Sequence, residues 1–225
     1  GTGHAGVNES ANGSGGLNVT VASGAIVTGG TTAGGVKLSR TGTGSNNIGN
    51  TGTITGAGTA ANPVISIATT SSGSTIITDN PGGVIQSTNV TSNNKPADLA
   101  IYSSVTTGND SIGNAGTLIG QIKLSNATNS LTNTGTWSAR DNAGAGFTAA
   151  AFGTGGHNTL TNSGAGVINA GNALAVATAT FTGIETINNS GTINAGLYGP
   201  GDVTTFDASG NVQTVTNTGT MNVHG

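Results

Sequence analysis

The chain has 225 residues and a formal net charge of −3, and only 6% of its residues are Asp, Glu, Lys or Arg. An ordinary globular domain carries about 25% charged residues. Five Lys and Arg residues in total exclude an electrostatic nucleic-acid footprint. Aromatic residues make up 3%, so a core of large rings is excluded, whereas the abundant Val, Ile and Thr favour pleated sheet.

Other classes are excluded by composition. The 41 Gly residues are typical of flexible linkers, but the low net charge and only 4 Pro argue against disorder. There is no Cys, so no disulfide framework stabilises the chain. No window approaches the roughly 20 apolar residues of a membrane-spanning helix, so we expect no membrane insertion by this segment. The chain starts Gly1-Thr2-Gly3, which indicates a processed chain or part of a longer one.

Residues 1–47 are predicted to be irregular or to form N-terminal coils. Apolar residues alternate at Leu17, Val19 and Val21, and 19–26 is interpreted as an eroded first copy of a repeat. Such alternation is typical of half-buried strands. The same alternation predicts further strands at Ile65 and Ile67, at Ile122 and Leu124, and from Leu174 through Val176, Thr178 and Thr180.

From residue 48 onward a clear repeat appears, of the form apolar-x-Asn-x-Gly-x-apolar. Its five complete copies begin at Ile48, Ile112, Leu131, Ile187 and Val215. Two imperfect copies surround Asn80 and Asn162. The predicted turn ladder is therefore Asn50, Asn80, Asn114, Asn133, Asn162, Asn189 and Asn217, with separations of 19 to 34 residues. A period in this range indicates a solenoid, a propeller or an array.

The repeat predicts one corner per coil. Asn tolerates the left-handed region, and Gly accepts unusual dihedrals, so together they turn the chain sharply between two strands. The flanking apolar residues then point inward, and coils stacked about 4.8 Å apart bring the Asn amides into hydrogen-bonding range. The sequence therefore predicts an all-β, right-handed parallel β-helix, a single β-solenoid domain over 1–225 with about seven to eight coils and loop insertions.

Two other all-β folds fit the pattern less well. Propeller blades of about 40–50 residues would not recur every ~28 residues. A β-sandwich would show antiparallel hairpins rather than one turn motif repeated in phase.

The phrases NTGTI (50–54), NAGTL (114–118), NTGTW (133–137), NSGTI (189–193) and NTGTM (217–221) resemble the passenger repeats of Gram-negative autotransporters and related large surface adhesins. The resemblance covers about 48–223. It implies a right-handed parallel β-helix at the cell surface, acting in adhesion, self-association or a structural layer. No outer-membrane barrel segment is present. The resemblance then implies a translocator beyond residue 225 or another route of export.

No constellation of residues predicts catalysis. The acidic residues are scattered one or two per coil and are interpreted as solvated loop carboxylates: Glu9, Asp79, Asp98, Asp110, Asp141, Glu185, Asp202 and Asp207. His4, His157 and His224 lack metal-ligand spacing. The segment 108–111 resembles a calcium-binding turn but occurs once. We predict no catalytic, cofactor-binding or metal-binding residues.

Trp137 occupies an inward slot of the repeat and is predicted to pack in the core, with stacking on a sugar as the secondary interpretation. The insertions 86–100, 140–156 and 195–205 are the predicted binding loops.

Three functions remain open. The first is a secreted or cell-surface protein that mediates adhesion or self-association, with a host or surface glycan as a second kind of partner. The second is a subunit of an extracellular filament or sheath built by head-to-tail stacking, because open solenoid ends expose strand edges. The third, a polysaccharide-degrading enzyme, is disfavoured because no site assembles.

Overall fold

The chain is a parallel β-solenoid in the computed structural model. The structure describes residues 3–69, 72–87, 99–104, 108–124, 128–139, 147–153, 157–169, 179–182, 184, 186–195, 205–207 and 214–223. All regular elements in this part of the chain are strands, and no helix is found there. This confirms the all-β solenoid predicted from the repeat.

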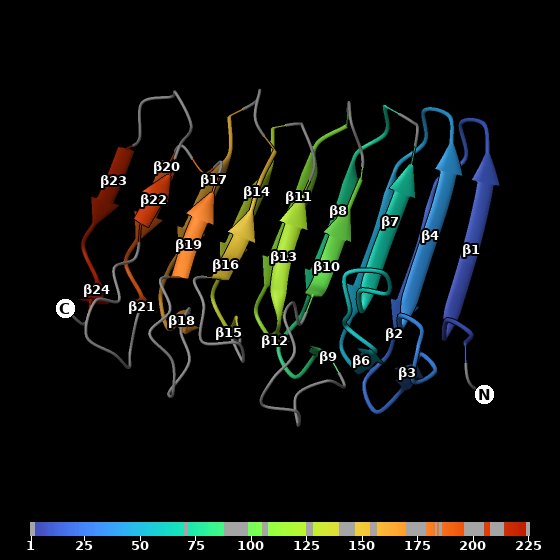
Figure 1. Cartoon of the computed structure of the whole chain (residues 1–225), viewed down its shortest axis with the longest axis horizontal. Helices are drawn as coiled ribbons and strands as arrows, with labels where there is room; N and C mark the ends of the chain where they lie inside the picture. Colours follow the sequence, from blue (N-terminus) through green and yellow to red (C-terminus); the bar gives the residue numbers. More distant parts are fainter. Residues whose placement is uncertain are drawn as a thin grey trace.

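Three parallel sheets of eight strands each form the walls (Figure 1). Sheet A contains β1 (Val7–Asn12), β4 (Val36–Thr41), β7 (Ile65–Thr69), β10 (Leu99–Ser103), β13 (Gln121–Leu124), β16 (Phe147–Ala151), β19 (Ala179–Thr182) and β22 (Thr205–Asp207). Sheet B contains β2 (Leu17–Val21), β5 (Asn46–Asn50), β8 (Thr75–Asp79), β11 (Asp110–Asn114), β14 (Ser130–Asn133), β17 (Thr159–Asn162), β20 (Thr186–Asn189) and β23 (Thr214–Asn217). Sheet C contains β3 (Ile26–Thr28), β6 (Thr53–Gly56), β9 (Val84–Ser87), β12 (Thr117–Ile119), β15 (Thr136–Ser138), β18 (Val167–Asn169), β21 (Thr192–Ala195) and β24 (Thr220–Val223).

The chain visits the three sheets in the order A, B, C and then returns to A one rung further along the axis. Every strand therefore pairs with the strand three places away in sequence, as Figure 1 shows for sheet A along the front of the molecule. Residues 7–41 supply β1 to β4, which pair in register with later strands, so this N-terminal part consists of coils rather than irregular chain.

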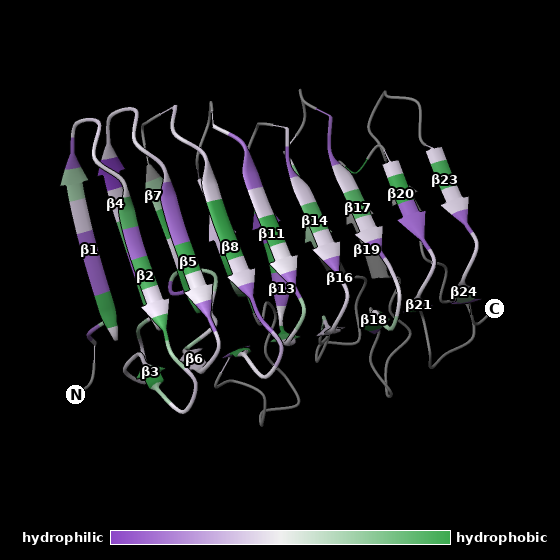
Figure 2. Ribbon diagram, turned by 180° about the vertical axis from the view of Figure 1, so that it is seen from behind, coloured by the Kyte–Doolittle hydropathy of each residue, from purple (hydrophilic) through white to green (hydrophobic). Residues whose placement is uncertain are grey.

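The interior is filled by columns of apolar side chains. The two apolar positions of the repeat face inward from sheets B and C, as the sequence predicted; in one coil these are Ile48 and Ile54, both 0% exposed. Figure 2 shows aligned hydrophobic bands that cross successive strands of sheet B. Burying one such side chain stabilises the folded chain by about 1.5–3 kcal/mol. Val and Ile occupy the columns because branched side chains pack well on a pleated surface.

The corner between sheets B and C does not interrupt backbone pairing. The N–H after each ladder residue donates to the carbonyl oxygen of the previous rung, as Thr134 does to Asn114 at 2.8 Å and Ser190 to Asn162 at 2.8 Å. The ladder Asn is the last residue of its strand, and its side chain is buried except at Asn217 in the last rung. Three of these corners contain a glycine with positive φ, which is Gly24, Gly82 or Gly164. The left-handed conformation expected for the ladder Asn stays a prediction.

The Gly of the Asn-x-Gly repeat is required because adjacent coils approach closely at this position. A Cβ on Gly135 would collide with the carbonyl oxygen of Gly116, and one on Gly219 with that of Gly191. At every glycine of this column a Cβ would lie within 3.0 Å of a backbone carbonyl oxygen of the previous coil; the column is Gly52, Gly83, Gly116, Gly135, Gly166, Gly191 and Gly219. In the first coil, Ala25 occupies the position that corresponds to Gly52 in the next coil.

Trp137 lies in the core, as predicted, with no exposed surface. Its indole Nε1 donates to the carbonyl oxygen of Gly120 at 2.9 Å. Full burial rules out stacking of this ring on a sugar.

We predict that Trp137→Phe lowers the free energy of unfolding by about 2 kcal/mol, because the Gly120 carbonyl loses its donor and the smaller ring leaves a void. Denaturant unfolding followed by circular dichroism measures this. The exposed neighbour replacement Thr136→Val should leave stability nearly unchanged, and equal effects of the two would contradict the assigned role.

Candidate functional site

The most ordered polar feature is an internal ladder of side-chain amides at the corner between sheets B and C. Asn114 Nδ2 donates to Asn133 Oδ1 at 2.7 Å, and Asn133 Nδ2 donates to Asn162 Oδ1 at 2.8 Å. The series continues through Asn162, Asn189 and Asn217 at 2.8 and 2.7 Å. Every bond runs in the same direction, from one rung to the next toward the C-terminus.

The ladder amides from Asn50 to Asn189 also connect sheet B to sheet C. Besides its bond to the next rung, the Asn133 Nδ2 donates to the carbonyl oxygen of Val167 at 3.3 Å, and that of Asn162 donates to Thr192 at 3.1 Å. The column is buried, since Asn133 and Asn162 are 0% exposed. Buried amides of this kind strengthen one another in low dielectric and are costly to leave unpaired.

Asn80 is not a rung of the ladder, in contrast to the sequence prediction. Asp79 pairs in register with Asn50 on one side and with Asn114 on the other, so it occupies the column. Three residues separate Asp79 from its column glycine Gly83, whereas one residue separates Asn133 from Gly135. This longer corner displaced the sequence alignment by one residue. Asn80 lies just outside, and its Nδ2 donates to the carbonyl oxygen of Asn50 at 3.2 Å. The remaining six predicted rungs lie in the column.

A second buried polar column stands at the opposite end of the sheet B strands. Its described members are Asn46, Thr75, Asp110, Asn129 and Asn158. Asn46 Nδ2 donates to Thr75 Oγ1 at 3.2 Å, and Asn129 Nδ2 donates to Asn158 Oδ1 at 3.0 Å. Sequence reasoning missed this column, although a polar residue four places before each ladder residue is a signal that could have found it.

Two carboxyls are buried in these columns, which corrects their interpretation as solvated loop acids. Asp79 is 1% and Asp110 is 2% exposed. Burial raises the pKa of Asp79 to about 6, partly opposed by a hydrogen bond from Asn50. Burial likewise raises the pKa of Asp110 to about 6, partly opposed by the hydroxyls of Ser103 and Thr75. Removing a carboxylate from water favours its neutral form.

The outer face of sheet A is the candidate contact surface. It carries small polar side chains over β1, β4 and β7, and two shallow hollows lie on it, of about 270 and 350 Å³. Ser and Ala create the hollows because short side chains leave space between longer neighbours. The smaller hollow is lined by Ser10, Asn12, Ser39, Arg40, Thr41, Ala68 and Ser104.

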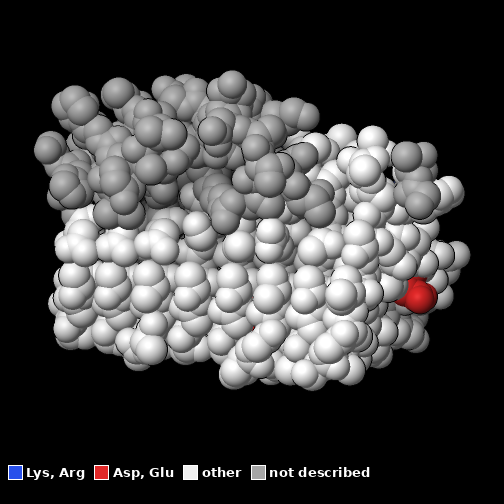
Figure 3. Space-filling model, turned by 90° about the horizontal axis from the view of Figure 1, so that it is seen from below, with Lys and Arg blue, Asp and Glu red and all other residues white. Residues whose placement is uncertain are grey.

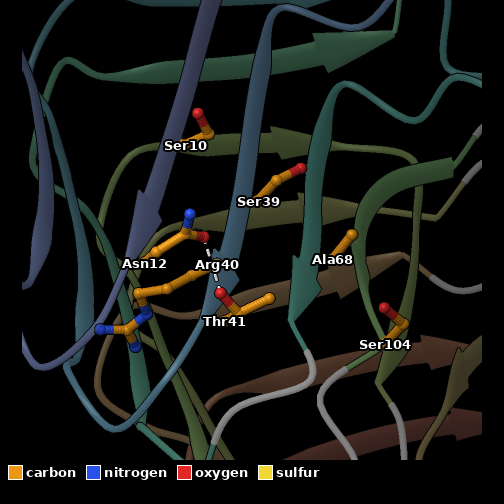
Figure 4. Close-up of a pocket in the computed structure, with 7 residues that line it drawn as sticks. All are labelled: Ser10, Asn12, Ser39, Arg40, Thr41, Ala68 and Ser104. Atoms are coloured by element: carbon orange, nitrogen blue, oxygen red, sulfur yellow. Dashed lines mark hydrogen bonds between the residues drawn. The ribbon is translucent and has the colours of Figure 1, made fainter.

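Figure 4 shows how this hollow is built. Ser10, Ser39 and Ala68 come from adjacent strands, and the Thr41 hydroxyl donates to Asn12 Oδ1 at 2.7 Å. The guanidinium of Arg40 points away from them and donates to the carbonyl oxygen of Gly15 at 3.1 Å. The hollow therefore offers hydroxyl and amide groups rather than a positive charge.

One row along this face carries the exposed cations of the described chain. Lys37, Ser66, Tyr102 and Lys123 follow one another in register on β4, β7, β10 and β13. The Lys123 Nζ lies 6.0 Å from the centroid of the Tyr102 ring, in range of a cation–π interaction. His4 and Asn62 line the larger hollow beside Lys37. A flat ring, two ammonium groups and many hydroxyls can bind a hydroxyl-rich or anionic ligand.

The other predicted residues do not come together in a site within the part of the chain that the structure describes. His4 and His157 are exposed, and no group of His, Asp and Glu able to hold a metal occurs among the described residues. Asp110, from the segment compared with a calcium-binding turn, faces the interior of β11. His224, Asp98, Asp141, Glu185 and Asp202 lie outside the described residues, as do most of 86–100, 140–156 and 195–205. Glu9 is exposed, and Asp207 belongs to β22.

The described surface is almost free of charge on the face shown in Figure 3. No helix in the described part of the chain has the length and hydropathy needed to cross a membrane.

The fold is a parallel β-solenoid, and its described strands carry mostly hydroxyl and amide side chains on their outer faces. Comparisons with family models, curated proteins and solved structures found no match.

Proposed function

We propose that the chain is an extracellular surface protein of a Gram-negative bacterium that mediates adhesion or self-association, with the outer face of sheet A as the contact surface. The observation that carries the proposal is the row of Lys37, Tyr102 and Lys123 beside two polar hollows on an otherwise neutral face. Hydroxyls and amides suit many weak hydrogen bonds to a glycan or to a second surface.

In this proposal the solenoid is right-handed and has seven to eight coils. The eight strands in each sheet support the count. The handedness rests on the rule that parallel strands are joined by right-handed crossovers in about 98% of cases. The low charge supports a surface role over nucleic-acid binding.

The contact surface is tested by Lys37→Glu with Lys123→Glu, or by Tyr102→Ala alone. We expect at least tenfold weaker binding of the purified chain to an immobilised panel of neutral and uronate-containing polysaccharides, or weaker self-association in sedimentation. The matched control is Thr20→Glu with Thr132→Glu on the outer face of sheet B, which should bind as the unaltered chain does. Sheet A variants that bind normally would rule out this face as the contact surface.

A filament subunit is the second candidate, favoured by one observation. Val215 continues the interior column of sheet B in β23 and is 45% exposed, so a stacked copy could cover it. The Cβ of Ala25 opposes stacking in continued register, because this column leaves space only for Gly beside the preceding carbonyl. If copies stack head to tail, Ala25→Gly should lengthen the fibres seen by electron microscopy; monomers in both samples would remove this candidate.

A further inference from the structure

The strand pair β8–β11 contains both buried carboxyls of the described chain. Asp79 of β8 faces Asn114 of β11 at one end of the pair, and Asp110 of β11 faces Thr75 of β8 at the other. We propose that this pair is an acid-closed junction: neutral carboxyls of Asp79 and Asp110 hold the two rungs together, and their ionisation loosens this junction before any other in sheet B.

The geometry at Asp79 favours a proton, although the backbone N–H of Thr117 partly opposes the rise in its pKa. Asp79 Oδ1 accepts from Asn50 Nδ2 at 2.7 Å, so the other oxygen takes the place that an amide NH₂ occupies on every neighbouring rung. Asp79 Oδ2 and Asn114 Oδ1 are both buried without a hydrogen-bond partner. Two acceptors cannot satisfy each other. A protonated Oδ2 would donate to Asn114 Oδ1 and make the ladder continuous.

Asp110 has a similar environment at the other end of the strand. Neither of its carboxyl oxygens accepts a well-formed hydrogen bond, although the hydroxyls of Ser103 and Thr75 lie close enough to oppose the rise in its pKa. Its backbone N–H donates to Asn129 Oδ1 at 3.2 Å, and the facing Thr75 Oγ1 accepts from Asn46 Nδ2. A neutral carboxyl is cheaper to bury at this position than a charged one.

No opposite charge faces either carboxyl from the described strands packed around them. Strands β5, β6, β9, β12 and β14 contain no ionisable residue, β10 contributes the outward Tyr102 and β13 the outward Lys123. Arg40 of β4 lies against Gly44 and Gly73 at the corner that precedes β8 and donates to Gly15. Ionisation of Asp79 therefore produces an uncompensated buried charge.

The direction of the pH dependence follows from the two raised pKa values. Each carboxyl has a pKa of about 6 in the folded chain against 3.8 for an ordinary Asp, so folding favours the protonated form. The stabilisation is complete below pH 3.8, declines as the pH rises toward about 6, and is absent above it. A pKa difference of about two units changes the equilibrium between the closed and the open junction by about 100-fold for each carboxyl.

Amide hydrogen exchange of the 225-residue chain at pH 5 and pH 8, corrected for intrinsic rates, tests the proposal. We expect protection of the β8 and β11 amides to fall at least tenfold more than that of β14 and β17, whose facing rungs are both Asn. Asp79→Asn should supply an NH₂ to Asn114 and remove most of the loss, and adding Asp110→Asn should remove the remainder.

A transplanted carboxyl is the matched control. Asn133→Asp should confer a new pH-dependent loss of protection on β14 and β17, and Asp79→Asn should leave that loss unchanged. Equal protection of β8–β11 at both pH values in the unaltered chain would overturn the proposal. So would a pKa for Asp79 near 4 in a carbon-13 NMR titration, or an Asp79→Asn variant whose pH dependence equals that of the unaltered chain.

Discussion

Gly135→Ala is expected to destabilise the solenoid by about 3 kcal/mol or more, because the new Cβ would collide with the backbone of Gly116 and Ala115 one rung earlier. The colliding atoms are carbonyl groups of a paired strand corner, which cannot rotate away as a flexible side chain could. The neighbouring coils would have to separate, and the backbone bond from Thr136 to the Gly116 carbonyl, 2.9 Å long, would lengthen. Thermal and denaturant unfolding measure the loss.

The chain offers a matched control for this substitution. Gly113 lies in β11, next to the ladder residue Asn114. A Cβ on Gly113 would meet no atom within 4 Å, and the φ of Gly113 is not in the left-handed region. Gly113→Ala should be neutral or slightly stabilising, because Ala loses less conformational entropy on folding than Gly does. If both variants lose stability equally, close packing of the glycine column is not the reason for its recurrence.

Asn133→Val is expected to lower the free energy of unfolding by about 3 kcal/mol. Asn114 Nδ2 would lose its acceptor and Asn162 Oδ1 its donor, and both groups would stay buried. For a chain of this size, a loss of this magnitude corresponds to a fall in melting temperature of about 10 °C.

Two companion variants separate the buried amide from backbone conformation. Asn133→Gly should be at least as harmful as Asn133→Val if the amide matters, whereas a left-handed corner residue would tolerate Gly well. Asn217→Val should cost less than about 1 kcal/mol, because Asn217 is exposed and Asn189 Nδ2 keeps its bond to the Thr220 carbonyl at 3.0 Å. If Asn133→Gly left the stability unchanged, a left-handed backbone at this position, rather than the buried amide, would explain why Asn recurs there.

Together these variants distinguish two contributions to the same corner. The Gly column sets how closely coils approach, and the Asn column supplies directional bonds between them. The chain can therefore stack with small side chains and almost no charge, because the polar atoms that stacking buries are satisfied by neighbouring rungs. The junction at Asp79 is an exception in the Asn column, because Asp79 Oδ2 and Asn114 Oδ1 lack a donor unless Asp79 is protonated. Other buried polar atoms without a partner belong to Arg40, Asn46 and Asp110.

Much of the fold was predictable from local pattern. Alternation at Leu17, Val19 and Val21 located β2, and Ile65 and Ile67 located β7, because inward and outward positions alternate along a strand. The stretch from Leu174 to Thr178 lies outside the described residues, and Thr180 belongs to β19. Asn80 was misassigned because Asn80-Pro81-Gly82, in the longer corner after Asp79, reproduces the Asn-x-Gly pattern one residue out of phase.

The repeat by itself determined the sheet-forming class, the two inward apolar positions and most of the amide column, because each depends on periodicity along the chain. Only the tertiary structure decided which residues face one another across rungs. It showed that the recurrent Gly is needed because a carbonyl of the previous coil leaves no room for a side chain. It also showed that Asp79 and Asp110 lie in the same strand pair. Those properties depend on distances between coils about 30 residues apart in sequence, and local patterns do not encode them because corner and loop lengths vary from coil to coil.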